Sequence, residues 1–163
     1  MNNNETPRET LSKRKPLRFW GWGYDHEELT TDETQLIDAM VKTFFPVDLT
    51  EVSEPQLDEF DLRPPRFDIP ANLSHLLSSS TYDRLVHSYG KSFADTARMF
   101  IREVPNPSDA VAFPEPEEDI SAIMEFAQMN NIAVLPFGRG TRVCGGFDAD
   151  VGDQLFLIHI SEP

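Results

Sequence analysis

The feature that most limits what this chain can fold into is a glycine-rich segment directly after a short apolar run. Residues 132–135 read Ile-Ala-Val-Leu, and residues 136–146 read Pro-Phe-Gly-Arg-Gly-Thr-Arg-Val-Cys-Gly-Gly, with four glycines in eleven residues. Glycine accepts positive φ and lets a ligand approach the main chain closely. Successive N–H groups in such a loop form a concave nest for anions. A strand followed by this loop predicts a phosphate or pyrophosphate site, and on spacing alone a plain glycine-rich turn is the alternative.

The residues before the loop have the pattern of a strand, a helix and a second strand. Residues 110–113, Ala-Val-Ala-Phe, predict a short buried strand, and residues 132–135 predict another. The prolines and acids of 114–119 suit the first turn of a helix, because the helix dipole favours negative charge there. An apolar stripe at helical spacing follows, formed by Ile120, Ile123, Met124 and Ala127. We therefore predict a β-α-β unit with a helix over 117–130 and the glycine loop at its carboxyl end, where α/β sheets bind ligands.

The first part of the chain predicts helices joined by irregular segments. Thr30 to Glu33 fits a capping box, and an apolar helical face follows that must end before Pro46. That face consists of Leu36, Ile37, Met40, Val41 and Phe44. Ser80 can cap a second helix, which residues 89–92 interrupt. The helix that follows places Phe93, Ala97, Phe100 and Ile101 on one face.

Composition divides the chain into three parts. Residues 1–17 are polar and predict a disordered arm, residues 18–104 predict an N-terminal helical region, and residues 105–163 predict the start of a ligand-binding domain. The aromatic run over 19–24 is interpreted as a packing anchor rather than a ligand box. Residues 154–163 are in doubt, because Leu155–Ile158 reads as a strand with nothing after it to close a domain. The fold class is α+β, and we expect the chain to be a truncated fragment.

Charge and cysteine content exclude several classes of function. The chain has 163 residues and a net charge of −14, which disfavours nucleic-acid binding because phosphate backbones are repelled. The basic cluster near residues 13–18 is interpreted as solvated arm. A single cysteine, Cys144, forbids an intrachain disulfide. The absence of a membrane-length apolar run and of an apolar signal region predicts no membrane span and a cytoplasmic protein.

Other motifs in the sequence do not complete a known site. Gly90-Lys91-Ser92 ends like a P-loop, but the position five residues earlier is Leu85 rather than glycine. The glycine loop is also not a Rossmann fingerprint, because Val143 stands where the third glycine belongs. The four histidines have no ligand spacing, so we predict no metal site. Cys144 is interpreted as a small buried residue rather than a nucleophile.

Residues 105–147 resemble the opening of the FAD-binding domain of vanillyl-alcohol-oxidase-type (PCMH-type) flavoenzymes. The matching pieces are the strand at 110–113, Pro114 to Ile120, the helix to Asn130 and the loop at 136–146. Upstream, Phe19-Trp20-Gly21-Trp22-Gly23 and residues 87–92, His-Ser-Tyr-Gly-Lys-Ser, resemble alkylglycerone-phosphate-synthase-like FAD-linked oxidases. Together the resemblance covers residues 18–147.

The resemblance implies a nucleotide-binding flavoprotein whose loop amides hold the FAD pyrophosphate. It assigns this role to Pro136, Phe137, Gly138, Arg139, Gly140, Thr141 and Arg142. Arg142 departs from the family, which has a small hydroxyl residue there; a guanidinium can add a charge-assisted bond to phosphate or point to solvent. The resemblance also implies that the rest of the FAD domain, the substrate cap and the catalytic residues lie downstream of this chain.

The sequence therefore predicts FAD binding within the N-terminal part of an FAD-linked oxidoreductase, related to alkylglycerone-phosphate synthase. The partners expected are FAD and, through downstream residues, a small-molecule substrate. We expect the fragment alone to be inactive. Two alternatives stay open, an FAD-dependent 2-hydroxy-acid dehydrogenase fragment and a non-catalytic acidic interaction module.

Overall fold

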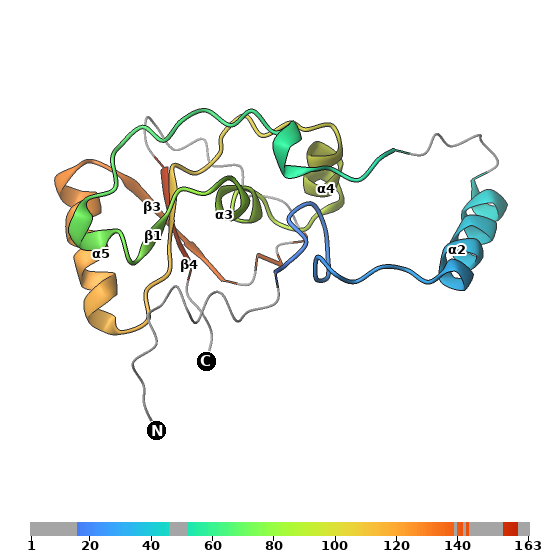
Figure 1. The fold of residues 1–163 in the computed structure, drawn as a ribbon, viewed down its shortest axis with the longest axis horizontal. Helices are drawn as coiled ribbons and strands as arrows, with labels where there is room; N and C mark the ends of the chain where they lie inside the picture. The colour runs from blue at the N-terminus through green and yellow to red at the C-terminus, as the bar shows by residue number, and fades with distance from the viewer. Residues whose placement is uncertain (1–15, 46–51, 139, 142, 144–154, 160–163) are drawn as a thin grey trace, which may run out of the picture.

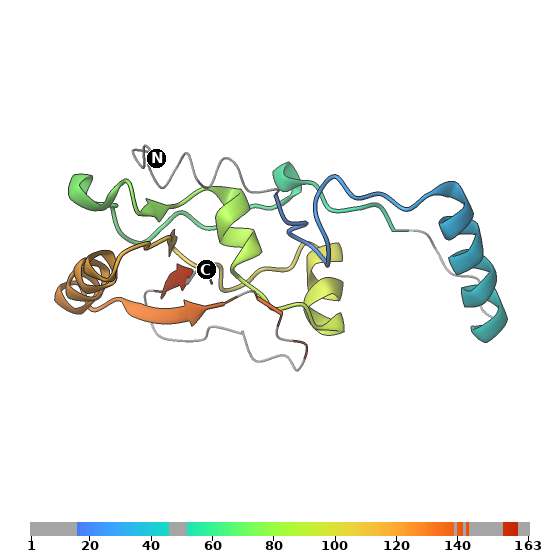
Figure 2. The ribbon, with the colours of Figure 1, turned by 90° about the horizontal axis from the view of Figure 1, so that it is seen from below.

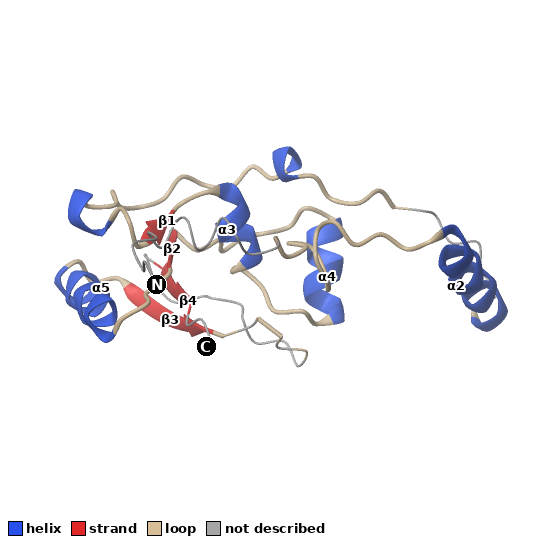
Figure 3. Ribbon diagram, turned by 60° about the horizontal axis from the view of Figure 1, so that its bottom comes forward, coloured by secondary structure: helices blue, strands red, loops and turns tan. Residues whose placement is uncertain are grey.

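The described strands form a four-stranded mixed sheet, which lies toward the end of the molecule opposite to helix α2 (Thr31–Phe44; Figure 1). The computed structural model describes residues 16–45, 52–138, 140–141, 143 and 155–159. The strands are β1 (Leu77–Ser78), β2 (Ala110–Ala112), β3 (Ala133–Phe137) and β4 (Leu155–His159). Their order is β1-β2-β4-β3, as Figure 3 shows. β4 runs parallel to both β2 and β3, so these three strands share one carboxyl edge, while β1 is antiparallel to β2.

β4 lies between the two strands predicted around the helix. Ala110 of β2 and Val134 of β3 flank the same residue of β4, Phe156, so β2 and β3 belong to one sheet without pairing to each other. Residues 155–158 were in doubt at the sequence level, and the structure makes them an inner strand. A continuous apolar run suits a parallel strand with a neighbour on each side. Residues 154 and 160–163 lie outside the described part of the chain.

β3 begins and ends later than predicted, at Ala133 and Phe137 instead of 132 and 135. Ile132 instead closes the preceding helix: its N–H donates to Ala127 O (2.9 Å), and Asn131 before it adopts φ 53°. This is the Schellman ending, in which asparagine accepts the left-handed conformation. Pro136 fits within β3 because the strand lies at the edge of the described sheet, where a missing N–H is tolerated.

Helix α5 (Glu117–Met129) covers the sheet, but only part of the predicted apolar stripe lies on its buried face. Ile123 and Ala127 are buried as expected, but Ile120 and Met124 are exposed. Phe126 completes the inner face and meets Phe67 edge to face, with ring centroids 5.8 Å apart. The helix therefore packs partly on the irregular segment before β1, which the sequence pattern does not reveal. The buried members of this core are Leu73, Leu76, Leu77, Ala110, Ala112, Ile123, Ala127 and Ile132.

The helical region contains three α-helices and two short 3-10 turns among the described residues. The helices are α2 (Thr31–Phe44), α3 (Thr81–Val86) and α4 (Phe93–Phe100), and the turns are η1 (Leu57–Glu59) and η2 (Ala71–Leu73). The predicted capping box of Thr30 and Glu33 is confirmed, and α2 ends before Pro46. None of the α2 residues is buried, and the helix stands apart from the rest of the molecule (Figures 1 and 2).

The predicted apolar face of α4 is only partly buried: Phe100 is half-buried against Trp20, whereas the rest of the face points to solvent. Phe93 is 90% exposed and Ile101, just after the helix, is 68% exposed. The buried side instead carries Asp95 and Met99. Asp95 turns inward because its carboxylate accepts hydrogen bonds from the N–H (3.2 Å) and Oγ (2.8 Å) of Ser92, which forms a buried capping box. The cap thus outweighs the apolar pattern in orienting this short helix.

The aromatic run near the start of the chain packs against the helical region. Phe19 meets Phe60 edge to face at 5.7 Å, and Trp20 meets Phe100 at 5.2 Å. Lys91 fastens the segment, since its Nζ donates to Arg18 O (3.1 Å) and Phe19 O (3.4 Å). The packing interpretation therefore holds for Phe19 and Trp20. The ammonium group of Lys91 donates to main-chain carbonyls, which is a structural role and not that of a P-loop lysine.

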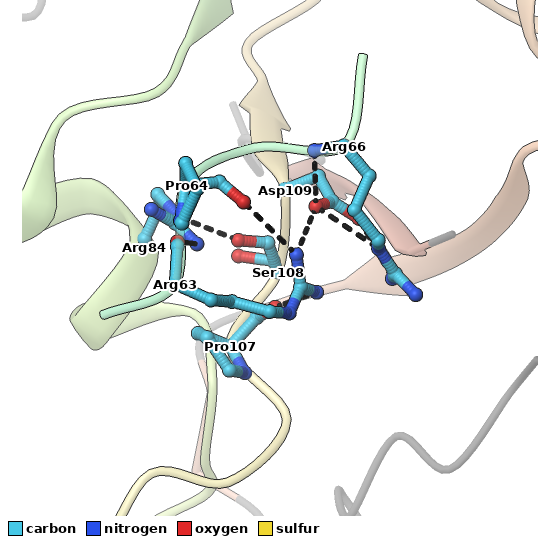
Figure 4. Close-up of polar contacts among 7 residues, drawn as sticks. All are labelled: Arg63, Pro64, Arg66, Arg84, Pro107, Ser108 and Asp109. Carbon is cyan, nitrogen blue, oxygen red and sulfur yellow. Dashed lines mark hydrogen bonds and ion pairs between the residues drawn. The ribbon is translucent and has the colours of Figure 1, made fainter. Parts of the chain in front are cut away.

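A buried carboxylate joins the irregular segment at 62–66 to the start of β2 (Figure 4). Asp109 is fully buried and forms ion pairs with Arg63 and with Arg66, whose Nη2 lies 2.9 Å from Oδ2. The backbone N–H of Arg66 also donates to Oδ1 (3.0 Å). Arg84, itself buried, donates to Ser108 O (2.6 Å) and Arg63 O (2.8 Å), which ties α3 to the same point.

Replacing Asp109 with asparagine should strongly destabilise the protein, because two arginines would lose the carboxylate that pairs with them. Removing one partner of a fully buried ion pair costs about 3–5 kcal/mol, and because Arg63 and Arg66 are 30% and 32% exposed the loss here should be about 2–3 kcal/mol, as for hydrogen bonds to a charged group. The control is Asp38→Asn, which removes an exposed i,i+4 pair with Lys42 and should cost less than about 0.5 kcal/mol. Urea denaturation of both variants measures the difference, and two equally small losses would contradict the role of Asp109.

The stability of the protein should rise between pH 8 and 10 because of Lys91. Burial lowers the pKa of Lys91 from 10.5 to about 8, while the charge of Asp95 opposes that shift. In this range the unfolded chain binds more protons than the folded one, so the free energy of unfolding increases with pH, by at most about 1.4 kcal/mol per unit. Above pH 10 Tyr82 acts in the opposite direction, because burial raises its pKa to about 12.

Lys91→Met should remove this rise, and denaturation curves of both proteins at pH 8, 9 and 10 provide the measurement. If the free energy of unfolding of the variant rises with pH as steeply as that of the parent, a group other than Lys91 is responsible.

Candidate functional site

The glycine loop leaves the sheet at the carboxyl end of β3. Pro136 and Phe137 are the last residues of the strand, and Gly138, Gly140, Thr141 and Val143 follow among the described residues. Arg139, Arg142, Cys144 and residues 145–146 lie outside the described part of the chain. Phe137 and Gly140 are buried, whereas Pro136, Gly138 and Thr141 are exposed. Among the described residues, the loop therefore has some that are buried in the protein and others that are exposed to solvent.

Gly140 is required by the shape of the loop. Its φ is 67°, in the left-handed region, and a Cβ there would lie 2.5 Å from Cζ and 2.9 Å from Cε1 of Phe137. Gly138 differs, since a Cβ at that position would meet nothing within 4 Å. The main chain thus folds directly over the Phe137 ring at Gly140, and both the backbone conformation and the lack of space demand glycine.

His87 meets the loop from the end of α3. Its ring centroid lies 4.5 Å from that of Phe137 and 5.7 Å, edge to face, from that of Phe113, the residue directly after β2. Nδ1 of His87 lies 2.7 Å from Asp83 O, one turn back in α3. Both His87 and Phe137 are only 4% exposed. The helical region, the end of β2 and the end of β3 therefore meet where the His87 ring contacts Phe113 and Phe137.

Sequence reasoning did not find this contact. His87 was one of four scattered histidines without ligand spacing, and its place in the His-Ser-Tyr-Gly-Lys-Ser motif was the one available signal. Phe137 was assigned to the loop, whereas its ring faces inward and its backbone pairs with His159 in the sheet. The two residues lie far apart in the sequence, so only the assembled sheet brings them together.

The charges in the loop favour an anion. Between residues 136 and 143 the sequence contains two arginines, Arg139 and Arg142, and no acidic residue, in a chain whose net charge is −14. The described loop residues Gly138, Gly140 and Thr141 contribute main-chain groups and one hydroxyl. Pro136 has no N–H to donate. The sequence of the loop therefore suits an anion, which main-chain N–H groups and positive charge both attract.

The described residues contain no group of three or more His, Cys, Asp or Glu side chains that could hold a metal ion. Within the same residues, no helix has both the length and the apolar character needed to span a membrane.

Comparison with known proteins shows similarity to one kind of enzyme. The chain is 43% identical over 67 residues to an alkyldihydroxyacetonephosphate synthase of Trypanosoma brucei brucei, which covers 41% of this chain and 11% of that protein. It is 23% identical to the synthase of Dictyostelium discoideum over 96% of this chain and 30% of that protein. The chain thus spans about 30% of the length of this relative. No protein-family model matches the chain.

A solved structure of alkyldihydroxyacetonephosphate synthase has the same fold. It superimposes with a TM-score of 0.71 over 88% of this chain and 32% of that chain, at 19% sequence identity. The mixed helices and small sheet described above therefore match a part of that enzyme's structure.

Gly140→Ala should destabilise the loop, while Gly138→Ala should not. Alanine in the left-handed conformation costs roughly 1–2 kcal/mol, and at position 140 it also collides with Phe137. We expect the free energy of unfolding to fall by about 1–3 kcal/mol for Gly140→Ala and by less than about 0.5 kcal/mol for Gly138→Ala. Urea denaturation without ligand measures both. Equal values for the two variants would contradict the need for glycine at 140.

Proposed function

We propose that this chain forms the part of an FAD-linked oxidoreductase that holds the FAD pyrophosphate, in a protein related to alkyldihydroxyacetonephosphate synthase. The observation that carries the proposal is the glycine loop at the carboxyl edge of parallel strands, with Gly140 buried at φ 67° above the Phe137 ring. Such an edge is where α/β sheets bind nucleotides. The sequence similarity to alkyldihydroxyacetonephosphate synthases supports the relation. These are the enzymes that the sequence resemblance calls alkylglycerone-phosphate synthases, because glycerone is another name for dihydroxyacetone.

The proposed donors are the main-chain amides from Gly138 to Arg142, with Thr141 adding a hydroxyl and Arg139 and Arg142 adding positive charge. Pro136 and Phe137 serve a different purpose in this proposal. They end β3 and supply the ring over which the loop turns. The PCMH-type assignment of the domain belongs to the same proposal and rests on the loop motif together with the helix and strands before it.

Bound FAD would supply the electron-accepting chemistry, and the role of this chain would be to bind and orient it. The proposed substrate is a small molecule. The similarity favours a glycerone phosphate over a 2-hydroxy acid as its class, because the relatives found are named alkyldihydroxyacetonephosphate synthases.

Titration of the complete gene product with FAD tests this proposal. We expect binding that quenches flavin fluorescence, and a dissociation constant at least tenfold higher for Gly140→Ala, because a misplaced loop loses amide contacts to phosphate. Gly21→Ala is the control, since a Cβ there would meet only Arg18 Cδ at 3.9 Å. A complete gene product that binds no FAD would contradict the proposal and favour the acidic interaction module.

A further inference from the structure

We infer that His87 is a positioning residue for the glycine loop. Its ring packs against the Phe137 ring, which contacts Gly140, and so supports the main-chain shape of the described loop residues Gly138, Gly140 and Thr141 before a ligand arrives. The ligand part of this inference rests on the proposed function, whereas the contact itself rests on geometry.

The contact is close and excludes water. The centroids of the two rings are 4.5 Å apart with the planes tilted by 53°, within the range of favourable aromatic pairs. Each residue is 4% exposed. Burial at this level leaves the Phe137 ring little freedom to move away from the loop.

The orientation of the His87 side chain is determined by a contact with the backbone of α3. Its Nδ1 lies 2.7 Å from Asp83 O, and this distance fits an Nδ1–H that donates to the carbonyl. Asp83 in turn is fixed by the start of the helix, where its carboxylate accepts from Ser80 Oγ (2.7 Å) and from Ser78 Oγ. Ser78 belongs to β1, so the orientation of the His87 ring is connected to the sheet as well as to the helix.

The tip of the Phe137 ring contacts the loop. A Cβ at Gly140 would lie 2.5 Å from Phe137 Cζ, so the main chain of Gly140 rests against the ring itself. The order of contacts is therefore α3, His87, Phe137 and Gly140. A loop held in its binding shape loses less conformational entropy when a ligand binds, which raises affinity.

Three variants of the complete gene product separate the ring from the hydrogen bond. His87→Ala removes both, and we expect it to raise the dissociation constant for FAD about tenfold. His87→Phe keeps a ring, and Asp83 O keeps the backbone N–H of residue 87 at 3.1 Å as a donor, so we expect binding within about threefold of the parent. His75→Ala is the control, since His75 is exposed, and should leave binding unchanged.

Unchanged FAD binding in His87→Ala, or equal losses in His87→Ala and His87→Phe, would overturn the inference. If His87→Ala does not fold, His87→Asn replaces it, because asparagine can still donate toward Asp83 O but has no ring.

Amide hydrogen exchange without flavin gives a readout that does not depend on the proposed function. In His87→Ala the amides of Phe137, Gly138, Gly140 and Thr141 should exchange at least tenfold faster, while those of α5 keep their rates. A protein that binds no FAD but shows this pattern would refute the proposed function and leave the role of His87 intact. Unchanged loop exchange, or equal acceleration throughout the molecule, would overturn the positioning role.

Discussion

The arrangement of the molecule depends on the buried carboxylate of Asp109. The segment around Arg63 and Arg66 has no regular secondary structure, so no ladder of backbone hydrogen bonds determines where it lies. Two arginines converging on one fully buried carboxylate determine it instead. An unpaired charge in that position would be costly, so other placements of the segment are disfavoured. Arg84 adds α3 to the same junction through Ser108 O and Arg63 O.

This junction at the start of β2 has consequences at the strand's other end. With α3 fixed beside β2, its last turn brings His87 to Phe113, which follows the strand, and to Phe137. The polar junction and the aromatic contact thus lie at opposite ends of the same short strand. The ion pairs of Asp109 position the segment at 62–66 beside β2. The rings of His87 and Phe137 support the main chain where the glycine loop leaves the sheet. The proposed function needs both, because a main-chain anion site has no affinity unless its amides point to one place.

Local signals in the sequence were reliable where one chemical interaction decides the outcome. Thr30 and Ser80 each begin a helix as predicted, because capping depends on residues three positions apart. The acidic turn before Ile120 begins α5 without a side-chain cap, since the helix dipole favours negative charge there. Faces were less predictable. The apolar stripe of α4 was outweighed by the buried cap of Ser92 and Asp95, and Met124 points outward because α5 leans on Phe67, which no local pattern reveals. For the site, the sequence indicated the loop and its glycines, while His87 required the assembled sheet.

The position of β4 in the sheet also bears on how the chain is made. β2 and β3 leave the ribosome first, and neither pairs with the other, because each uses β4 as its neighbour. Until residues 155–159 emerge, both strands of the nascent chain have open edges, which are templates for aggregation. Contacts so far apart in sequence also form slowly. Synthesis therefore passes through an interval in which the glycine loop exists but the strand that aligns its edge does not, and the exposed strand edges make aggregation most favourable during that interval.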